Sequence, residues 1–249
     1  MIHILTIHYN DRWVDLQLEK FAQYIKQPYN VYTILGNNYE EHKNKFHYAI
    51  EGQMKHYDAL DTLRKYLLTQ NIDPDDIVIV IDSDAFPVCT IDDYLENKLS
   101  EYQFLAINEP RHNYSAVPEQ PFECFYAFRY KFFETGFDFH YEVGIHSNWI
   151  DWMIPWFQRQ KIDWYRMNRS NKKNLHDLYY GVYDNMIFHS WCGSFESRGN
   201  SRITRPDRIR SQRENISIDL IVYENIQIFD MVWLELNNNF DVFIRSLIE

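Results

Sequence analysis

The chain has 249 residues, a formal net charge of −11 at pH 7 and an aromatic content of 17%. This length suits one α/β domain with insertions, and the aromatic residues can build a core and line a polar ligand site. The acidic charge does not favour nucleic acid as a partner, because phosphate contacts supply most of the affinity for a duplex. The segment 198–213, which holds six arginines, keeps that partner open.

Cysteine usage and hydropathy indicate a compartment. Cys89, Cys124 and Cys192 are odd in number and widely spaced, so they form no disulfide framework. The first ten residues, MIHILTIHYN, lack the charged and apolar regions of a signal peptide. No window approaches the roughly 18 apolar residues that span a bilayer. We therefore expect a soluble, cytoplasmic protein, and the sequence leaves its oligomeric state open.

The first hundred residues alternate between strand and helix patterns. Strands are predicted at residues 2–7, 30–36 and 77–81, and helices at about 10–27 and 53–70. In the first helix Val14, Leu18, Phe21 and Ile25 share a face, and Asp11 is a candidate N-cap. In the second helix a shared face is formed by Leu60, Leu63 and Leu67. This order predicts a Rossmann-like βαβαβ unit with a parallel sheet, in which the β-branched run Ile77–Ile81 is a central strand. The glycine-rich dinucleotide loop is missing, because HYNDRW follows the first strand and the chain has only seven glycines.

The second half is less regular. Strands are predicted at 103–108, 124–129, 162–168 and 185–191, and a Trp-rich helical segment near 146–160 is interrupted by Pro155. An apolar helical region begins at about residue 215. We expect a single α/β domain over residues 1–210, made of a first half (1–100) and a second half (101–210). A C-terminal helical extension would occupy residues 211–249.

Two aspartates follow the most apolar strand. Asp82 and Asp84 stand on the same side of an extended chain, about 6–7 Å apart, at the edge where parallel sheets bind ligands. Burial and mutual repulsion would penalise both carboxylates, and a divalent cation such as Mn²⁺ or Mg²⁺ removes both penalties. The alternative is that Asp82 caps the following turn and Asp84 is solvated. Asp73 and Asp75 have the same spacing in a polar turn, where a solvated loop is expected.

Several segments resemble one family. IVIVIDSDAFPV (77–88) is similar to the metal-binding strand of GT-A-fold glycosyltransferases, in particular a bacterial and viral group with a DxDAFP element. EGQMKHYDALDTL (51–63), PFECFYAFRYKFF (121–133) and MNRSNKKNLHDLYYGVYDNMIFHSWCGSF (167–195) resemble later segments of that group in the same order. The resemblance implies a GT-A-like fold with a mixed central sheet, in which residues 1–100 form the donor and metal half and residues 101–210 the acceptor half. It also implies transfer of a sugar from a UDP- or GDP-sugar donor to a glycan or other hydroxyl acceptor.

The resemblance also implies roles for individual residues. Asp84 and His189 would bind the metal directly, and Asp82 would reach the metal or the donor ribose. His189 is otherwise a core or loop histidine. The donor site would further include residues at the end of the first strand, at the start of the second helix, beside Asp82 and in a later polar cluster. These residues are Thr6, His8, Tyr9, Lys55, His56, Asp58, Ser83, Arg169 and Asn171. Ser170 and His176 belong to the same polar cluster as Arg169 and Asn171. Ordinary helix-start polarity and a solvated turn are the competing interpretations of these groups.

An inverting transferase also needs a base near the acceptor hydroxyl. Asp151, a lone acid among aromatic residues, is the first candidate and Glu109 is the second. Two other classes compete with a transferase. One is a different metal-dependent phosphate enzyme, such as a nucleotidyltransferase or a phosphatase of the haloacid dehalogenase type. The other is a non-catalytic carbohydrate- or nucleotide-binding protein on the same scaffold.

Overall fold

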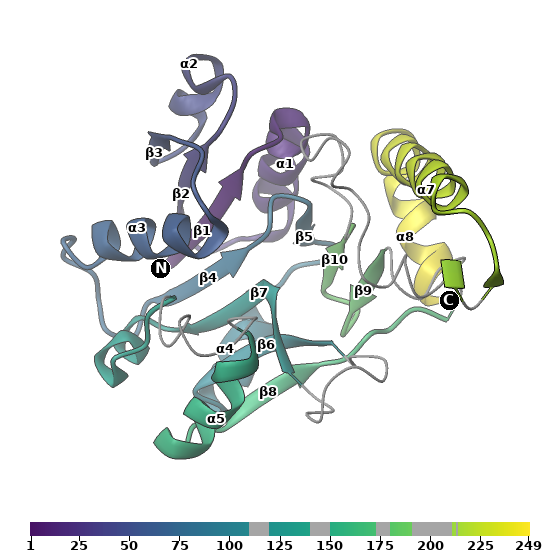
Figure 1. Ribbon diagram of the computed structural model, residues 1–249. Coiled ribbons are helices and arrows are strands. Elements are labelled where there is room, and N and C mark those ends of the chain that lie inside the picture. The colour runs from purple at the N-terminus through teal and green to yellow at the C-terminus, as the bar shows by residue number, and fades with distance from the viewer. Residues whose placement is uncertain (110–119, 140–149, 173–179, 191–210, 213) are drawn as a thin grey trace.

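The computed structural model describes residues 1–109, 120–139, 150–172, 180–190, 211–212 and 214–249. Within these ranges the chain forms a seven-stranded sheet and a three-stranded sheet with helices around them (Figure 1). The large sheet has the order β3-β2-β1-β4-β7-β6-β8 and the small sheet the order β5-β10-β9. The strands of the large sheet are β1 Ile2–His8, β2 Tyr29–Leu35, β3 Tyr48–Glu51, β4 Ile77–Ile81, β6 Phe104–Glu109, β7 Gln120–Arg129 and β8 Trp164–Met167. Those of the small sheet are β5 Ala85–Pro87, β9 Gly181–Tyr183 and β10 Ile187–His189.

The amino-terminal half is the predicted βαβαβ unit. Strand β1 pairs in parallel with both β2 and β4, and helices α1 (Val14–Tyr24) and α3 (His56–Leu67) connect these strands. The sequence did not predict the edge strand β3, which is short and only partly buried. It follows a turn of helix, α2 (Tyr39–His42), and a 3₁₀ turn, η2 (Lys43–Lys45).

The carboxyl-terminal half makes the sheet mixed, as expected. Strand β7 runs antiparallel to both β4 and β6, whereas β6 and β8 are parallel. Helix α4 (Asp92–Glu101) precedes β6, the 3₁₀ helix η3 (Tyr130–Thr135) follows β7, and α5 (Ile150–Gln160) precedes β8. The prediction that Pro155 interrupts α5 was wrong. Pro155 lies inside the helix, where proline removes only one backbone donor and the flanking residues Met153, Trp156 and Phe157 are buried.

The sheet is covered on both faces, which explains the continuous apolar run of β4. Side chains alternate along a strand, so Val78 and Val80 pack on one face with α3 and α5. Ile77, Ile79 and Ile81 pack on the other face with α1 and α4. Helix α3 contributes Leu60, Leu63 and Leu67 to the first face, which confirms the helical face predicted from their spacing.

The small sheet lies between the large sheet and the two C-terminal helices, α7 (Ile218–Asn238) and α8 (Phe240–Ile248) (Figure 1). One of its faces, with Phe86, Val182 and Phe188, packs against these helices. The predicted C-terminal helical extension is therefore present, and it supports the strand that ends in His189. None of the helices within the described ranges is long and apolar enough to cross a bilayer.

The start of the first helix differs from the prediction. Asn10, rather than Asp11, is the cap: its backbone is extended and its side chain accepts the N–H of Arg12. Asp11 is the first residue of the 3₁₀ turn η1 (Asp11–Trp13) that leads into α1. Trp13, the last residue of η1, is fully buried and packs edge-on against Trp233 of α7, with 4.9 Å between the ring centroids.

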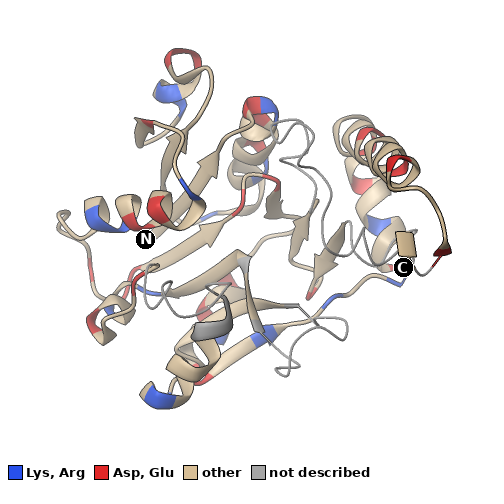
Figure 2. Cartoon of the chain, in the orientation of Figure 1, with Lys and Arg blue, Asp and Glu red and all other residues tan. Residues whose placement is uncertain are grey.

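Charged residues lie mainly on the outer helices (Figure 2). Helix α3 has an acidic residue in its first turn and basic residues in its last turn, an arrangement that complements the helix dipole. The arginine-rich segment 198–213 falls outside the described part of the chain except for residues 211 and 212. The expectation about nucleic acid therefore stays a prediction.

Candidate metal centre

A tight turn connects β4 to β5 and carries both aspartates of the motif. The N–H of Asp82 donates to the carbonyl of Cys124 on β7, and the N–H of Ala85 donates to the carbonyl of Asp82, both at 3.1 Å. These bonds end the strand at the carboxyl edge of the large sheet. The chain then enters the small sheet directly, so the turn is fixed at both of its ends.

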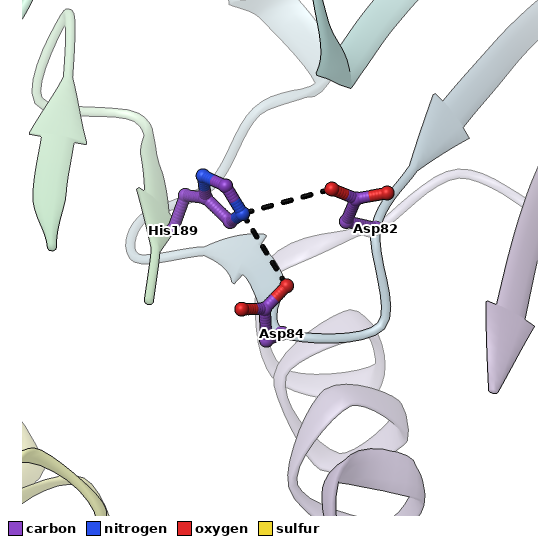
Figure 3. A group of neighbouring side chains, drawn as sticks. All are labelled: Asp82, Asp84 and His189. Carbon is purple, nitrogen blue, oxygen red and sulfur yellow. Dashed lines mark ion pairs between the residues drawn. The ribbon is translucent and has the colours of Figure 1, made fainter. Parts of the chain in front are cut away.

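His189 reaches this turn from the other side. Strand β10 pairs antiparallel with β5, which places His189 opposite Ala85, and the N–H of Ser190 donates to the carbonyl of Asp84. The ring nitrogen Nε2 of His189 lies 3.3 Å from Oδ1 of Asp84 and 3.7 Å from Oδ2 of Asp82 (Figure 3). His189 is more than 100 residues away from Asp82 and Asp84 in the sequence, yet the three side chains face one point.

This donor set fits a divalent cation. Asp82, Asp84 and His189 each offer one ligand atom, and these atoms all lie within 4.8 Å of one another. Two carboxylates at this distance repel, and the burial of Asp84 and His189 strengthens that repulsion by limiting hydration. Carboxylate oxygens suit Mg²⁺ and Mn²⁺, and the imidazole nitrogen favours Mn²⁺, because Mg²⁺ prefers oxygen ligands and water.

Small residues flank His189 in the small sheet. Ala85 is its neighbour on one side and Gly181 on the other. The guanidinium of Arg169 occupies the space above Gly181, where an added Cβ would lie 2.9 Å from its Nε. Arg169 also donates to the carbonyl of Tyr180. Gly181 and His189 are directly opposed on neighbouring strands, and such residues have Cβ atoms about 5 Å apart. The guanidinium above Gly181 therefore lies in the row of side chains next to His189.

His56 lies on the outer side of Asp82. Its Nε2 is 3.7 Å from Oδ1 of Asp82, whereas Oδ2 of the same carboxylate faces His189. His56 is the first residue of α3, and the predicted neighbours Lys55 and Asp58 stand at the same helix start. Asp82 thus has one oxygen directed at the metal ligands and the other at the start of α3.

The predicted residues at the end of β1 are mostly covered. Thr6 and His8 are fully buried, and burial lowers the pKa of His8 to about 3, so its ring is neutral at physiological pH. The hydroxyl of Tyr9 donates to the carbonyl of Met54, and its ring packs against Gly36. In this arrangement Tyr9 ties the end of β1 to the segment before α3.

The remaining predicted residues have different surroundings. Asn171 and Ser170 accept the N–H groups of Val182 and Asn185, so both side chains fasten their segment to the β9 hairpin. Ser83 lies between the two aspartates and is partly exposed. The side chains of Asp151 in α5 and Glu109 in β6 lie outside the described part of the structure. His176 lies outside the described residues altogether.

Sequence reasoning missed Gln17. This residue of α1 is fully buried and donates to the backbone of the Asp82–Ala85 turn. The signal was available, because Gln17 stands three residues after Val14 and four before Phe21. It is therefore a polar residue on an apolar helix face, where a buried amide needs a specific partner.

Comparison with known proteins gives distant structural likenesses. No protein-family model matches the chain, and no curated protein does either. A putative nucleotide-diphospho-sugar transferase from Desulfovibrio desulfuricans is 12% identical, with a TM-score of 0.47 over 92% of this chain and 97% of that one. A 4-diphosphocytidyl-2C-methyl-D-erythritol synthase from Anaerococcus prevotii is 10% identical, with a TM-score of 0.45 over 68% and 88%.

The glycosyltransferase GlyE from Streptococcus pneumoniae is also 10% identical, with a TM-score of 0.42 over 67% of this chain. The matched part spans 45% of the GlyE chain, so more than half of that protein has no counterpart here. Likenesses at these scores are too distant to carry an argument about activity.

Proposed function

We propose that this protein is a metal-dependent glycosyltransferase that uses a UDP- or GDP-sugar donor and a hydroxyl acceptor such as a glycan. The observation that carries the proposal is the convergence of Asp82, Asp84 and His189 at the carboxyl edge of a βαβαβ unit. That edge is where open α/β sheets bind nucleotides. The missing glycine-rich loop leaves the diphosphate without its usual backbone cradle, and a cation would replace it.

The residues of the site have separate proposed roles in binding the metal and the phosphates. Asp84 and His189 would hold Mn²⁺ or Mg²⁺, with Asp82 as a third ligand through Oδ2. When bound, the ion would act as a Lewis acid that stabilises the negative charge of the departing nucleoside diphosphate. Arg169, in the row beside His189, would add a fixed positive charge toward the same phosphates.

The other proposed roles follow from position. Tyr9 at the end of β1 and Lys55 and Asp58 at the start of α3 would border the nucleotide, and the buried Thr6 and His8 would support them from within the core. Ser83 and Asn171 would border the donor sugar and its phosphates. Asp151 or Glu109 would take the proton of the acceptor hydroxyl in an inverting reaction, whereas a retaining reaction would need no such base.

A thermal-shift screen tests this proposal. UDP-, GDP- and CMP-sugars are added with and without Mn²⁺, and the hits are then assayed for donor hydrolysis. We expect one nucleotide class to raise Tm only when Mn²⁺ is present and to be hydrolysed slowly. Metal-dependent binding without any turnover would instead support the non-catalytic binding protein. If no nucleotide sugar raises Tm with Mn²⁺, the proposed function is wrong.

A further inference from the structure

Gln17 of α1 contacts the turn that carries the candidate metal ligands, and it has no solvent exposure. Its Nε2 donates to the backbone carbonyl of Asp82 and to that of Ala85, each at 2.7 Å. Its Oε1 accepts the hydroxyl of Thr6 at 3.2 Å. Both ends of the side-chain amide are therefore engaged.

The partners fix the orientation of this amide. The carbonyls of Asp82 and Ala85 can only accept, so the NH₂ group of Gln17 has to face the turn. The Thr6 hydroxyl supplies the donor that the oxygen of Gln17 needs. A flipped amide would set its oxygen against two carbonyl oxygens inside the core, where unmade hydrogen bonds are costly.

The two acceptors of Gln17 are the two ends of the turn. The residues between them are Ser83 and Asp84, and the N–H of Ala85 closes the turn onto the carbonyl of Asp82. Both bonds from Nε2 of Gln17 go to backbone carbonyls, so Gln17 acts on the backbone from which the two carboxylates project. The direction in which the two side chains point therefore depends on this contact.

We infer that Gln17 is a positioning residue that holds the Asp82–Ala85 turn in its metal-binding conformation before a cation arrives. Without a cation, repulsion between the carboxylates of Asp82 and Asp84 favours any backbone change that separates them. Two short hydrogen bonds from a buried side chain oppose that change. The inference rests on the proposed metal site, and it adds a determinant of metal affinity that lies outside the ligand set.

Titration with Mn²⁺ alone, followed by electron paramagnetic resonance, tests the inference without any enzymatic assay. Gln17→Met keeps the length of the side chain and removes both donors. We expect it to bind Mn²⁺ about 10- to 100-fold more weakly than wild type, the range for residues that orient metal ligands. Leu67→Ala is the matched control, because Leu67 is fully buried at the far end of α3. It should lower Tm and leave Mn²⁺ affinity unchanged.

The outcomes separate this inference from the proposed function. If wild type binds Mn²⁺, Asp84→Asn does not, and Gln17→Met binds as wild type, Gln17 has only a structural role and the inference is wrong. If wild type itself binds no Mn²⁺, the metal site and the inference both fail. If Gln17→Met does not fold, Thr6→Val decides: it frees Oε1 of Gln17 and should weaken Mn²⁺ binding about 10-fold. Unchanged affinity in that folded variant would overturn the inference.

Discussion

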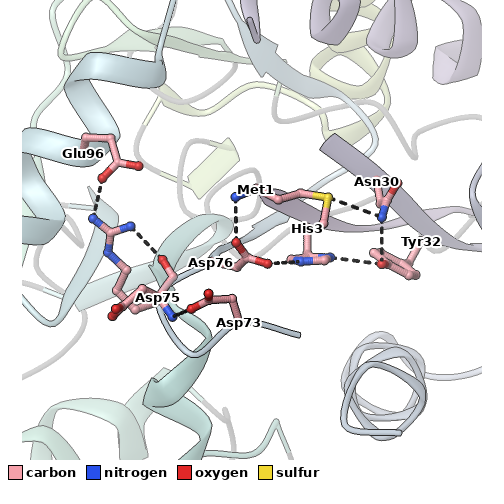
Figure 4. A network of polar contacts seen from close by, with 9 residues as sticks. Met1, His3, Asn30, Tyr32, Asp73, Asp75, Asp76 and Glu96 are labelled. Carbon is pink, nitrogen blue, oxygen red and sulfur yellow. Dashed lines mark hydrogen bonds and ion pairs between the residues drawn. The ribbon is translucent and has the colours of Figure 1, made fainter. Parts of the chain in front are cut away.

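The two ends of strand β4 carry the same short motif in opposite surroundings. Before the strand, Asp73 accepts the N–H of Asp75, and Asp75 pairs with Lys131 at 2.6 Å (Figure 4 shows the two aspartates). After the strand, Asp82 and Asp84 face one imidazole (Figure 3). The side chain of Asp75 is 72% exposed and that of Asp84 is 9% exposed. Spacing is identical in the two pairs, so burial and partners make the difference.

The contrast extends to the neighbouring strand. At the first end, His3 on β1 contacts both the hydroxyl of Tyr32 and the carboxylate of Asp76, so that carboxylate already has a partner within the protein (Figure 4). At the second end, the carboxylates of Asp82 and Asp84 share one imidazole, that of His189, at 3.7 and 3.3 Å. At the first end of the strands the polar groups thus form a closed network, whereas at the second end two carboxylates carry negative charge that an external cation can neutralise.

The largest effect is expected from a substitution that alters the second motif and leaves the first intact. Asp84→Asn should lower Mn²⁺ affinity about 100-fold or more, because it removes a charged ligand from a nearly buried site. It should also abolish metal-dependent turnover of the donor. Mn²⁺ titration and donor hydrolysis measure the two losses, and near-ultraviolet circular dichroism checks the fold.

Asp75→Asn is the control for that change. It alters the same chemical group at the same motif position, in an exposed turn whose partner is Lys131. Mn²⁺ affinity and turnover should equal those of wild type. Equal losses in the two variants would mean that the bound Mn²⁺ is not held by the Asp82–Asp84 turn.

The second prediction concerns pH and the two histidines of β1. Burial lowers the pKa of His8 from 6.5 to about 3 and also lowers the pKa of His3, where Asp76 opposes the change. The unfolded chain therefore binds protons near pH 6.5 that folded His8 does not bind, and stability is lost as pH falls from 6.5 toward 3. Between pH 7 and pH 5, His8 alone should lower the free energy of unfolding by about 2 kcal/mol.

Urea unfolding of the metal-free protein at the two pH values measures this loss. His8→Phe replaces the titrating ring with one that cannot take up a proton, so the variant should lose about 2 kcal/mol less than wild type between pH 7 and pH 5. His3→Phe should remove a smaller share, because Asp76 already supports the charged form of His3. An undiminished loss in His8→Phe would contradict the assignment.

The elements that the sequence predicted are those with a strong local pattern. The run Ile77–Ile81 could be assigned to a central strand because both faces of β4 are buried, and the leucines of α3 because they share one face. Strands β5 and β9 were missed. Each has three residues and is stabilised by pairing with β10, so their formation depends on contacts between distant segments.

The same distinction applies to the candidate site. Asp82 and Asp84 were predictable from the strand before them, whereas His189 entered through the family resemblance. The contact of His56 with Asp82 and that of Gln17 with the turn depend on how α3 and α1 pack against the sheet. A sequence shows that Gln17 is polar on an apolar face, but it does not show which carbonyls the amide meets.

The smallest effect is expected from substitutions of the residues that pair with the two motifs, His56 and Lys131. His56 lies 3.7 Å from the outer oxygen of Asp82, as Lys131 lies beside Asp75. His56→Ala should weaken Mn²⁺ binding about 10-fold, because Asp82 then loses the group that orients its second oxygen. His56→Gln, whose amide can donate to that oxygen, should restore part of the affinity. Lys131→Ala should leave Mn²⁺ binding unchanged, since its exposed ion pair is at the opposite edge of the sheet. If His56→Ala and Lys131→Ala bind Mn²⁺ equally well, His56 does not orient Asp82, and the turn alone accounts for the site.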